Sequence, residues 1–236
     1  MKYFILNALL FSTLFVSAQE LEFTGKLIGL QNNTKVILSD LRSRPSGKRF
    51  HDTASVSNGV FKFKTVLPGA GTYALRVALI GQNPEHRKLY LDGGKVQLQG
   101  KRGELKKAKV SSDAPYMMDY ILFTELMESQ DVFARKKLLI DTSMMRMAET
   151  GSYDGLLKAP GLLDRMMKVE KEAKAKETEL AKKWLVENPN SDINAYIIKT
   201  YLRSKINESP VKEAIIKLSP AARRSFPGII LTSTSK

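Results

Sequence analysis

Apolar and polar residues alternate along the first half of the chain, in short runs separated by turn residues. The clearest runs are residues 21–28, 36–38, 55–64 and 73–79. Such alternation is typical of a strand with one buried face and one exposed face. About seven short strands, with turn signals every ~8–12 residues, predict an antiparallel β-sandwich.

Two turn signals predict where neighbouring strands meet. Asn58-Gly59 favours a type I′ turn, because both central residues of that turn need a positive φ. Asp92-Gly93-Gly94 separates two further apolar runs, residues 88–91 and 96–98. We therefore expect a hairpin at each of these two turns.

After Ser112 the apolar residues recur every three or four positions, which indicates helices. The pattern predicts a first helix that begins after a cap at Asp113, a second over residues 130–147 and a third over residues 162–187. A fourth begins after a cap at Ser191 or Asp192, and a last one begins at Ser209-Pro210. In the second of these, Phe133, Leu138 and Met144 are expected in the core. Asn188-Pro189 should end the third, because proline cannot continue a helix.

The expected fold class is therefore α+β, with an antiparallel β-sandwich over residues 19–112 followed by an α-helical region over residues 113–236. Because the helices follow one another at short intervals, we expect them to pack as an antiparallel bundle.

Residues 1–18 are predicted to be a signal peptide. Lys2 precedes an apolar run over residues 3–16, and Val16-Ser17-Ala18 places small residues at the −3 and −1 positions of a cleavage site. The run is shorter than the ~20 residues that span a bilayer, so no transmembrane segment is expected after cleavage. We therefore expect a periplasmic or secreted protein, and without a cysteine it is not a lipoprotein.

The 236 residues include no cysteine and two histidines, and the formal net charge is +14. Without cysteine the chain has no disulfide, no thiolate metal site and no thiol nucleophile. A basic chain often binds nucleic acid, but an exported one meets anionic envelope material instead. We therefore expect no nucleic-acid partner, and the sequence indicates no cofactor.

Most of the net positive charge lies between Glu20 and Ser112, where two groups of cations stand out. The residues expected to bind an anion are Arg42, Arg44, Lys48 and Arg49 in the first group, and Arg87, Lys88, Lys101, Arg102, Lys106 and Lys107 in the second. Lys95 and Lys109 belong to the same basic stretch. If the groups face one way, they attract anions at short range. The alternative is that these cations only protect sheet edges from association.

Other candidate constellations favour structural roles. His51-Asp52-Thr53 would alternate between the two faces of a strand, and His86 has cationic neighbours that disfavour a metal ion. Glu170, Glu172, Glu177 and Glu179 alternate with lysines, which is typical of a solvated helix face. No catalytic, cofactor-binding or metal-binding residue is therefore assigned.

Several motifs together resemble a known family. They are Phe23-Thr24-Gly25-Lys26-Leu27, Asp52-Thr53 with Ser57-Asn58-Gly59-Val60-Phe61, and Leu89-Tyr90-Leu91-Asp92-Gly93-Gly94. Residues 21–125 resemble the N-terminal domain of unknown function that precedes thioredoxin-like domains (thiol:disulfide oxidoreductases of the AhpC/TSA type) in Gram-negative envelope proteins. Glu187-Asn188-Pro189-Asn190-Ser191, Leu218-Ser219-Pro220 and Ser225-Phe226-Pro227-Gly228 are similar to its later segments.

The resemblance implies a chain that carries the segments before the redox domain but not that domain. Thioredoxin chemistry needs a thiolate, which this chain cannot supply. The leading functional hypothesis is a non-catalytic interaction module of the cell envelope that partners a separate thioredoxin-like protein. The alternative is a binder of an acidic glycan or lipid phosphate through the basic β domain, and a hydrolase is a third, weaker candidate.

Overall fold

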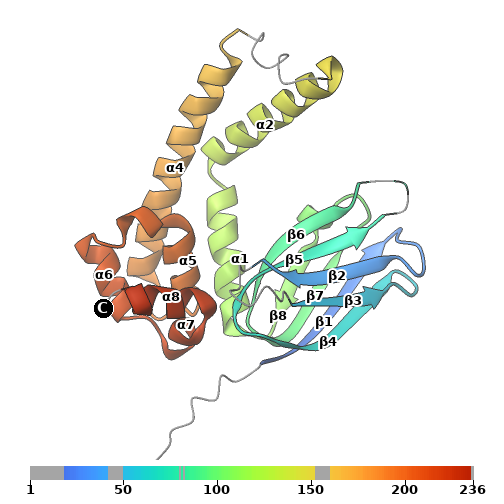
Figure 1. Cartoon of the computed structure of the whole chain (residues 1–236), viewed down its shortest axis with the longest axis horizontal. Helices are drawn as coiled ribbons and strands as arrows, with labels where there is room; N and C mark the ends of the chain where they lie inside the picture. The colour runs from blue at the N-terminus through green and yellow to red at the C-terminus, as the bar shows by residue number, and fades with distance from the viewer. Residues whose placement is uncertain (1–18, 42–49, 80, 82, 152–159, 235–236) are drawn as a thin grey trace, which may run out of the picture.

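The computed structural model of the chain describes residues 19–41, 50–79, 81, 83–151 and 160–234. A two-layered β-sandwich stands beside a group of helices, and two long helices rise from that group (Figure 1). The predicted order, a β-sandwich and then an α-helical region, is confirmed. The expected signal peptide lies outside the described residues.

The strands form two four-stranded sheets. Their bounds are β1 (Gln19–Ile28), β2 (Lys35–Asp40), β3 (His51–Ser55), β4 (Val60–Leu67), β5 (Gly71–Ala78), β6 (Glu85–Leu91), β7 (Gly94–Lys101) and β8 (Lys109–Ser112). One sheet has the order β4-β1-β7-β8 and the other β3-β2-β5-β6. All pairs are antiparallel except β1 and β7, which run parallel. β6 and β8 are thus edge strands of different sheets.

Neither predicted hairpin extends into two paired strands, although the turns themselves form and Ser57 and Val60 make a single antiparallel bridge across the first of them. Asn58 and Gly59 have φ values of 50° and 74°, as a type I′ turn requires. However, β3 pairs with β2 and β4 pairs with β1, so this turn joins the two sheets. The turn at Gly93-Gly94 likewise joins β6 of one sheet to β7 of the other. Local residues fix the turn, but the inter-strand hydrogen bonds are made with strands distant in sequence.

The helical region begins immediately after β8. Its elements are α1 (Pro115–Glu128), α2 (Asp131–Thr150), α4 (Leu162–Glu187), α5 (Asn194–Tyr201), α6 (Ser209–Ile216), α7 (Pro220–Arg224) and α8 (Phe226–Thr234), with short 3-10 turns η1 (Leu105–Lys107) and η2 (Arg203–Lys205). The predicted extents of α4 and the start of α6 are confirmed. The predicted caps are wrong, since Ala114 and Ile193 occupy the cap positions of α1 and α5.

The predicted core face of α2 is also wrong in part. Leu138 and Met144 are exposed and Phe133 is half-buried, whereas Val132 and Ser143 are buried. α2 packs mainly against α4. A 3.6-residue repeat can place more than one apolar stripe on a helix, and only the neighbouring helix decides which one is buried.

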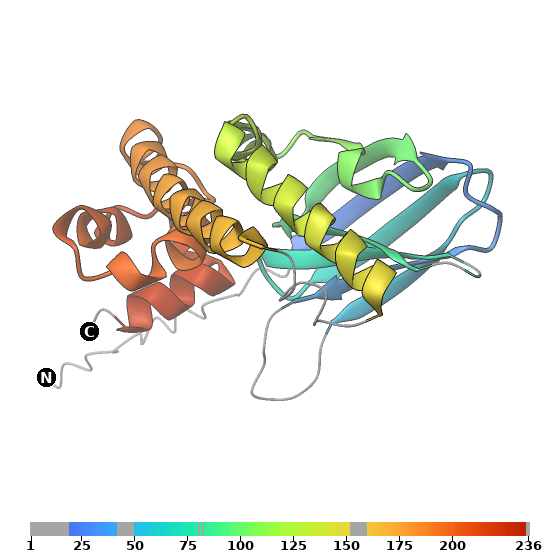
Figure 2. The same cartoon turned by 90° about the horizontal axis from the view of Figure 1, so that it is seen from above.

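The β-sandwich and the helices share one hydrophobic core. At their junction the Tyr90 ring lies 5.2 Å from that of Tyr196, and the Tyr116 hydroxyl donates to the Gly93 carbonyl at 2.7 Å. The Phe226 N–H donates to the Ala70 carbonyl at 3.2 Å. Figure 2 shows α8 and its neighbours against one end of the sandwich. The two regions are therefore packed against each other and not merely linked.

α2 and α4 form an antiparallel hairpin, while α5, α6, α7 and α8 surround the base of α4 (Figure 1). The bundle expected from the sequence is thus limited to this hairpin and its base. None of the helices in the described ranges combines the length and the hydropathy needed for a membrane span.

Asp92, at the junction of the two regions, gives the protein a pH-dependent stability. Burial raises the pKa of Asp92 to about 6, the nearby Asp192 carboxylate adds to this rise, and Arg224 opposes it. The folded protein thus binds this proton more tightly than the unfolded chain does. The free energy of unfolding should therefore fall as pH rises from about 4 to about 6 and remain lower above that window.

We expect Asp92→Asn to raise the free energy of unfolding at neutral pH by about 1 kcal/mol and to have little effect at about pH 4. A shift of two pKa units corresponds to about 3 kcal/mol, but partial exposure of Asp92 reduces the effect. Urea unfolding at several pH values measures this. Asp113→Asn, which removes an exposed carboxylate nearby, is the control. Parallel stability–pH curves for wild type and Asp92→Asn would contradict the prediction.

Candidate anion-binding cleft

A cleft of about 950 Å³ lies between α1 and the open edge of the sandwich formed by β6, η1 and β8. Because β6 and β8 end different sheets, α1 and η1 cover a side of the sandwich that would otherwise expose unpaired backbone groups. The cleft floor is apolar and includes Leu41, Ala74, Leu89, Ala108 and Val110. The cleft thus has an apolar base between a β wall and a helical wall.

Cationic and imidazole side chains from three elements line the β wall. They are His86, Arg87 and Lys88 of β6, Lys106 and Lys107 of η1, and Lys109 of β8. The four lysines are exposed, so their ammonium groups are accessible to a ligand. Of these four, only Lys107 has an ion pair among the described residues, with Glu104 at 3.2 Å. The wall therefore offers several cations to an incoming anion.

Two charged residues of β6 hold this wall in place. The Glu85 carboxylate accepts hydrogen bonds from the N–H groups of Gly103 and Leu105, each at 2.8 Å. The Arg87 guanidinium donates to the carbonyls of Leu105, at 3.2 Å, and Ala108. Burial lowers the pKa of Arg87, while Tyr120 and Glu128 act in the opposite direction. Arg87 is thus a positioning residue, since its donors hold the backbone on either side of Lys106 and Lys107.

The helical wall has the opposite charge. Glu125 and Glu128 of α1 line it together with Tyr120, Ile121 and Thr124. The Tyr120 hydroxyl lies 3.5 Å from the Lys88 carbonyl, where the two walls meet. A ligand in the cleft therefore meets cations on one side and carboxylates on the other.

The structure brings together four of the ten residues predicted to bind an anion: Arg87, Lys88, Lys106 and Lys107. Lys101 and Arg102 lie at the end of β7 and just beyond it, outside the cleft. Arg42, Arg44, Lys48 and Arg49 lie outside the described residues. The edge-protection alternative is also consistent with the geometry, because β6 and β8 are edge strands.

The cleft includes residues that the sequence did not assign to it. Lys109 belongs to the basic stretch of the sequence. Its position next to Ala108, just after Lys106 and Lys107, is the signal that could have assigned it to the cleft. Glu125 and Glu128 lie in a helix beyond the predicted domain boundary, so nothing local connected them with the lysines. His86 faces the cleft, and the described residues hold no cluster of histidines and carboxylates able to bind a metal ion.

The other sequence candidates do not converge on a site. His51 and Thr53 lie on one face of β3, and Asp52 lies between them on the other. Glu170 and Glu172 form ion pairs with Lys136 and Arg135 of α2, at 2.7 and 3.1 Å.

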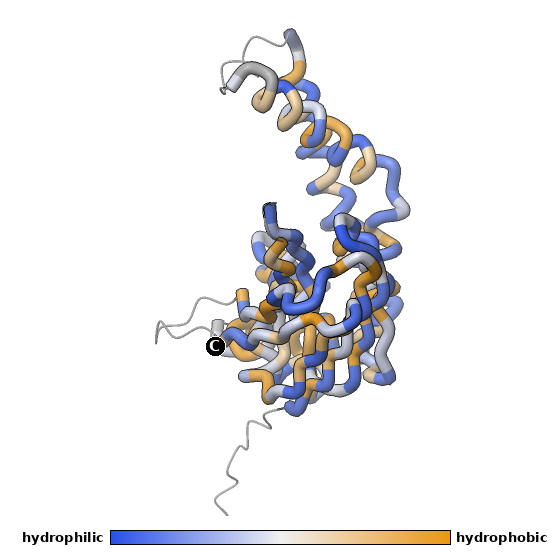
Figure 3. Tube along the Cα trace, turned by 90° about the vertical axis from the view of Figure 1, so that its right-hand side faces the viewer, coloured by the Kyte–Doolittle hydropathy of each residue, from blue (hydrophilic) through white to orange (hydrophobic). Residues whose placement is uncertain are grey.

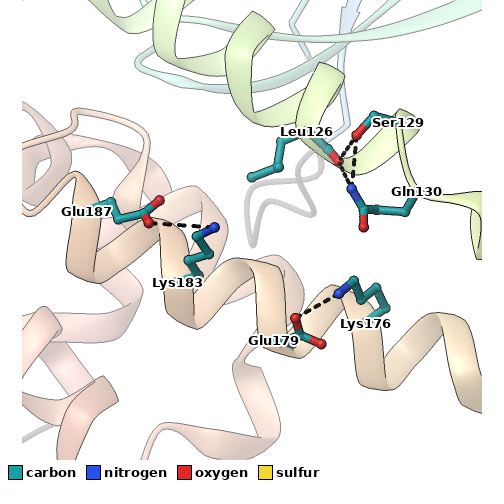
Figure 4. A network of polar contacts seen from close by, with 7 residues as sticks. All are labelled: Leu126, Ser129, Gln130, Lys176, Glu179, Lys183 and Glu187. Carbon is teal, nitrogen blue, oxygen red and sulfur yellow. Dashed lines mark hydrogen bonds and ion pairs between the residues drawn. The ribbon is translucent and has the colours of Figure 1, made fainter.

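Further along α4, Lys176 pairs with Glu179 at 2.7 Å and Lys183 with Glu187 at 3.7 Å (Figure 4). Figure 4 also shows Gln130 at the α1–α2 junction, where its amide donates to the Leu126 carbonyl and the Ser129 hydroxyl. Three of the four glutamates considered from the sequence, Glu170, Glu172 and Glu179, therefore belong to ion pairs between and along helices, whereas Glu177 forms none among the described residues.

Residues 21–114 match the model of a protein family described as Domain of unknown function (DUF4369). The match covers the β-sandwich and confirms the resemblance of the N-terminal region to a domain of unknown function. The matched segment includes β1 to β8 and the cationic wall of the cleft, whereas α1 lies beyond it. No curated protein and no solved structure matches the chain.

Proposed function

We propose that this protein is an exported binding module of the cell envelope whose cleft holds an anionic ligand. The observation that supports this proposal is the convergence of Lys88, Lys106 and Lys107 on one solvent-accessible wall that Arg87 holds in place. Lys109 adds a further cation to that wall. Close like charges repel one another, and a bound anion relieves that repulsion.

The helical wall favours an acidic glycan over a lipid phosphate. Glu125 and Glu128 would repel a ligand that carries negative charge on all sides. A glycan presents carboxylates or phosphates to the lysines, while its hydroxyl groups donate hydrogen bonds to the two glutamates. The Tyr120 ring and the apolar floor offer contact to the faces of the sugar rings. Recognition would thus combine charge on one wall with hydroxyl groups on the other.

Salt dependence tests this function. We expect the affinity for polygalacturonate, measured by isothermal titration calorimetry, to fall steeply between ~50 and 200 mM salt, by the counterion-release logic established for nucleic acids. The Lys106→Ala/Lys107→Ala variant should bind more weakly and show a shallower salt slope, by about one per lysine removed.

The matched control is Lys95→Ala/Lys101→Ala. It removes the same charge from exposed lysines of β7 that do not line the cleft. Equal losses in the two double variants would mean that net charge alone attracts the polymer, and the cleft proposal would fail. An affinity that does not change with salt would also reject it.

Partnership with a separate thioredoxin-like protein is a second proposal, supported by the family resemblance and by the absence of cysteine from this chain. Its test is crosslinking in intact cells. Repeated capture of no thioredoxin-like protein would contradict it.

A further inference from the structure

The distal half of the α2–α4 hairpin exposes large apolar side chains that no other element covers within the part of the chain that the structure describes. Six of the large hydrophobic residues that remain exposed lie there: Leu138 (67%), Ile140 (40%), Met144 (60%), Met145 (64%), Leu163 (50%) and Met167 (57%). Figure 3 shows the hairpin projecting from the body, with apolar segments along both of its helices. Exposed apolar side chains that gather on one part of a molecule mark an interaction site.

These side chains lie on more than one side of the hairpin. Ile140, Leu163 and Met167 line an apolar groove of about 470 Å³ between α2 and α4. At 3.6 residues per turn, Leu138 lies about 120° around α2 from Met144. Leu138 and Met145 are about two turns apart, so these two side chains lie on the same side of α2. A peptide or a second copy seated in the groove would leave Leu138 and Met145 in water. A lipid bilayer, in contrast, surrounds the part of a helix hairpin that enters it, and so covers the apolar side chains on both sides of the hairpin.

The charges around this apolar surface favour an anionic membrane. The carboxylates of Glu170 and Glu172 are already paired with Lys136 and Arg135. Lys137, Lys168, Lys171 and Lys174 are exposed and form no ion pair among the described residues. Two further carboxylates, Asp141 and Asp164, lie on the same part of the hairpin. Leucine beside unpaired lysines is a feature of helices that lie in the headgroup region of a bilayer, and the methionines add further flexible apolar surface.

We propose that the distal half of the α2–α4 hairpin docks on the surface of an anionic lipid bilayer. The apolar side chains enter the boundary between headgroups and acyl chains, and the lysines contact the lipid phosphates. This inference concerns a part of the molecule separate from the cleft and does not depend on the proposed glycan ligand.

Co-sedimentation of the mature protein with vesicles tests the proposal. We expect binding to vesicles of equal parts phosphatidylcholine and phosphatidylglycerol, and much weaker binding to pure phosphatidylcholine. Leu138→Asp/Met145→Asp and Ile140→Asp/Met144→Asp should each lower the partition coefficient about tenfold or more, because each double variant removes apolar burial. Helical circular dichroism checks that every variant is folded.

The matched control is Val186→Asp/Ile216→Asp, which makes the same change of charge at exposed apolar positions outside the distal hairpin. It should retain vesicle binding. Loss of binding in this control as well would show that charge alone is responsible, and the proposal would fail.

Three further results would overturn it. One is a wild-type protein that binds neither vesicle. Another is loss of binding in Ile140→Asp/Met144→Asp alone, which means that one side of the hairpin makes the contact and a bilayer does not cover both. The third is a dimer in light scattering that both hairpin variants dissociate, which means that a second copy covers this face.

Discussion

Replacing Gly228 with alanine should lower the free energy of unfolding by about 3 kcal/mol and the melting temperature by roughly 6–12 °C. A Cβ atom at this position would lie 2.0 Å from the Ala222 carbonyl oxygen and 2.8 Å from Arg223 Cα. Both atoms belong to the backbone of α7 or its cap, so α7 and α8 would have to separate.

That separation would extend beyond the two helices. The Gly228 N–H donates to the Ser225 hydroxyl, which in turn donates to Ala222, and the neighbouring Phe226 N–H donates to Ala70 of the sandwich. Displacing α8 therefore weakens the contact between helices and sheets. Thermal unfolding measures the stability, and limited proteolysis shows whether the C-terminal helix becomes accessible.

Gly161→Ala is the control for this prediction. Gly161 has a φ of 64° and no neighbouring atom within 4 Å of an added Cβ. Its substitution introduces backbone strain without a clash and should lower stability by about 1 kcal/mol. If the two variants melt at the same temperature, close packing of α7 on α8 is not the reason why position 228 requires glycine.

Replacing Gly25 with alanine should cost a similar amount, about 3 kcal/mol, for a different reason. Gly25 in β1 lies directly opposite Phe61 in β4. An added Cβ would lie 1.9 Å from Phe61 Cζ. Phe61 is fully buried and packs edge-on against Phe23 and Phe63, with ring centroids 6.0 and 5.8 Å away. Moving the ring away from a new methyl group would therefore disturb its packing against these two rings.

A double-mutant cycle isolates this contact. Phe61→Leu removes the distal ring atoms that the new methyl group would meet, and by itself it leaves a cavity. The double variant Gly25→Ala/Phe61→Leu should be more stable than the sum of the single effects predicts, by at least about 1 kcal/mol. Chemical denaturation of the four proteins gives this coupling energy. Strictly additive effects would be incompatible with a steric clash between the two residues.

The two proposed binding surfaces can be tested independently, because they share no residue. The cleft lies between α1 and the sandwich edge, and the exposed apolar surface lies on the distal parts of α2 and α4. A glycan-binding defect in the Lys106/Lys107 variant leaves the hairpin intact, and the hairpin variants leave the cleft intact. The proposal for each surface can therefore be confirmed or rejected independently of the other.

The sequence by itself determined the features that depend on neighbouring residues. The 2-residue repeat placed most of the strands, though not β8, and the 3.6-residue repeat placed α4 from Leu162 to Glu187, where Asn188-Pro189 ends it. Asn58-Gly59 adopts positive φ values because those two residue types tolerate them. These outcomes follow from backbone sterics and from burial on one face, both of which act over a few residues.

Only the tertiary structure decided which elements meet. Both predicted hairpins joined different sheets, and the buried side of α2 differed from the expected one, because partner choice depends on contacts far apart in sequence. The candidate site shows the same division. The sequence supplied Arg87, Lys88, Lys106 and Lys107, but their convergence required β6 and β8 to end two stacked sheets at one edge. Glu125 and Glu128 joined them only because α1 packs across that edge.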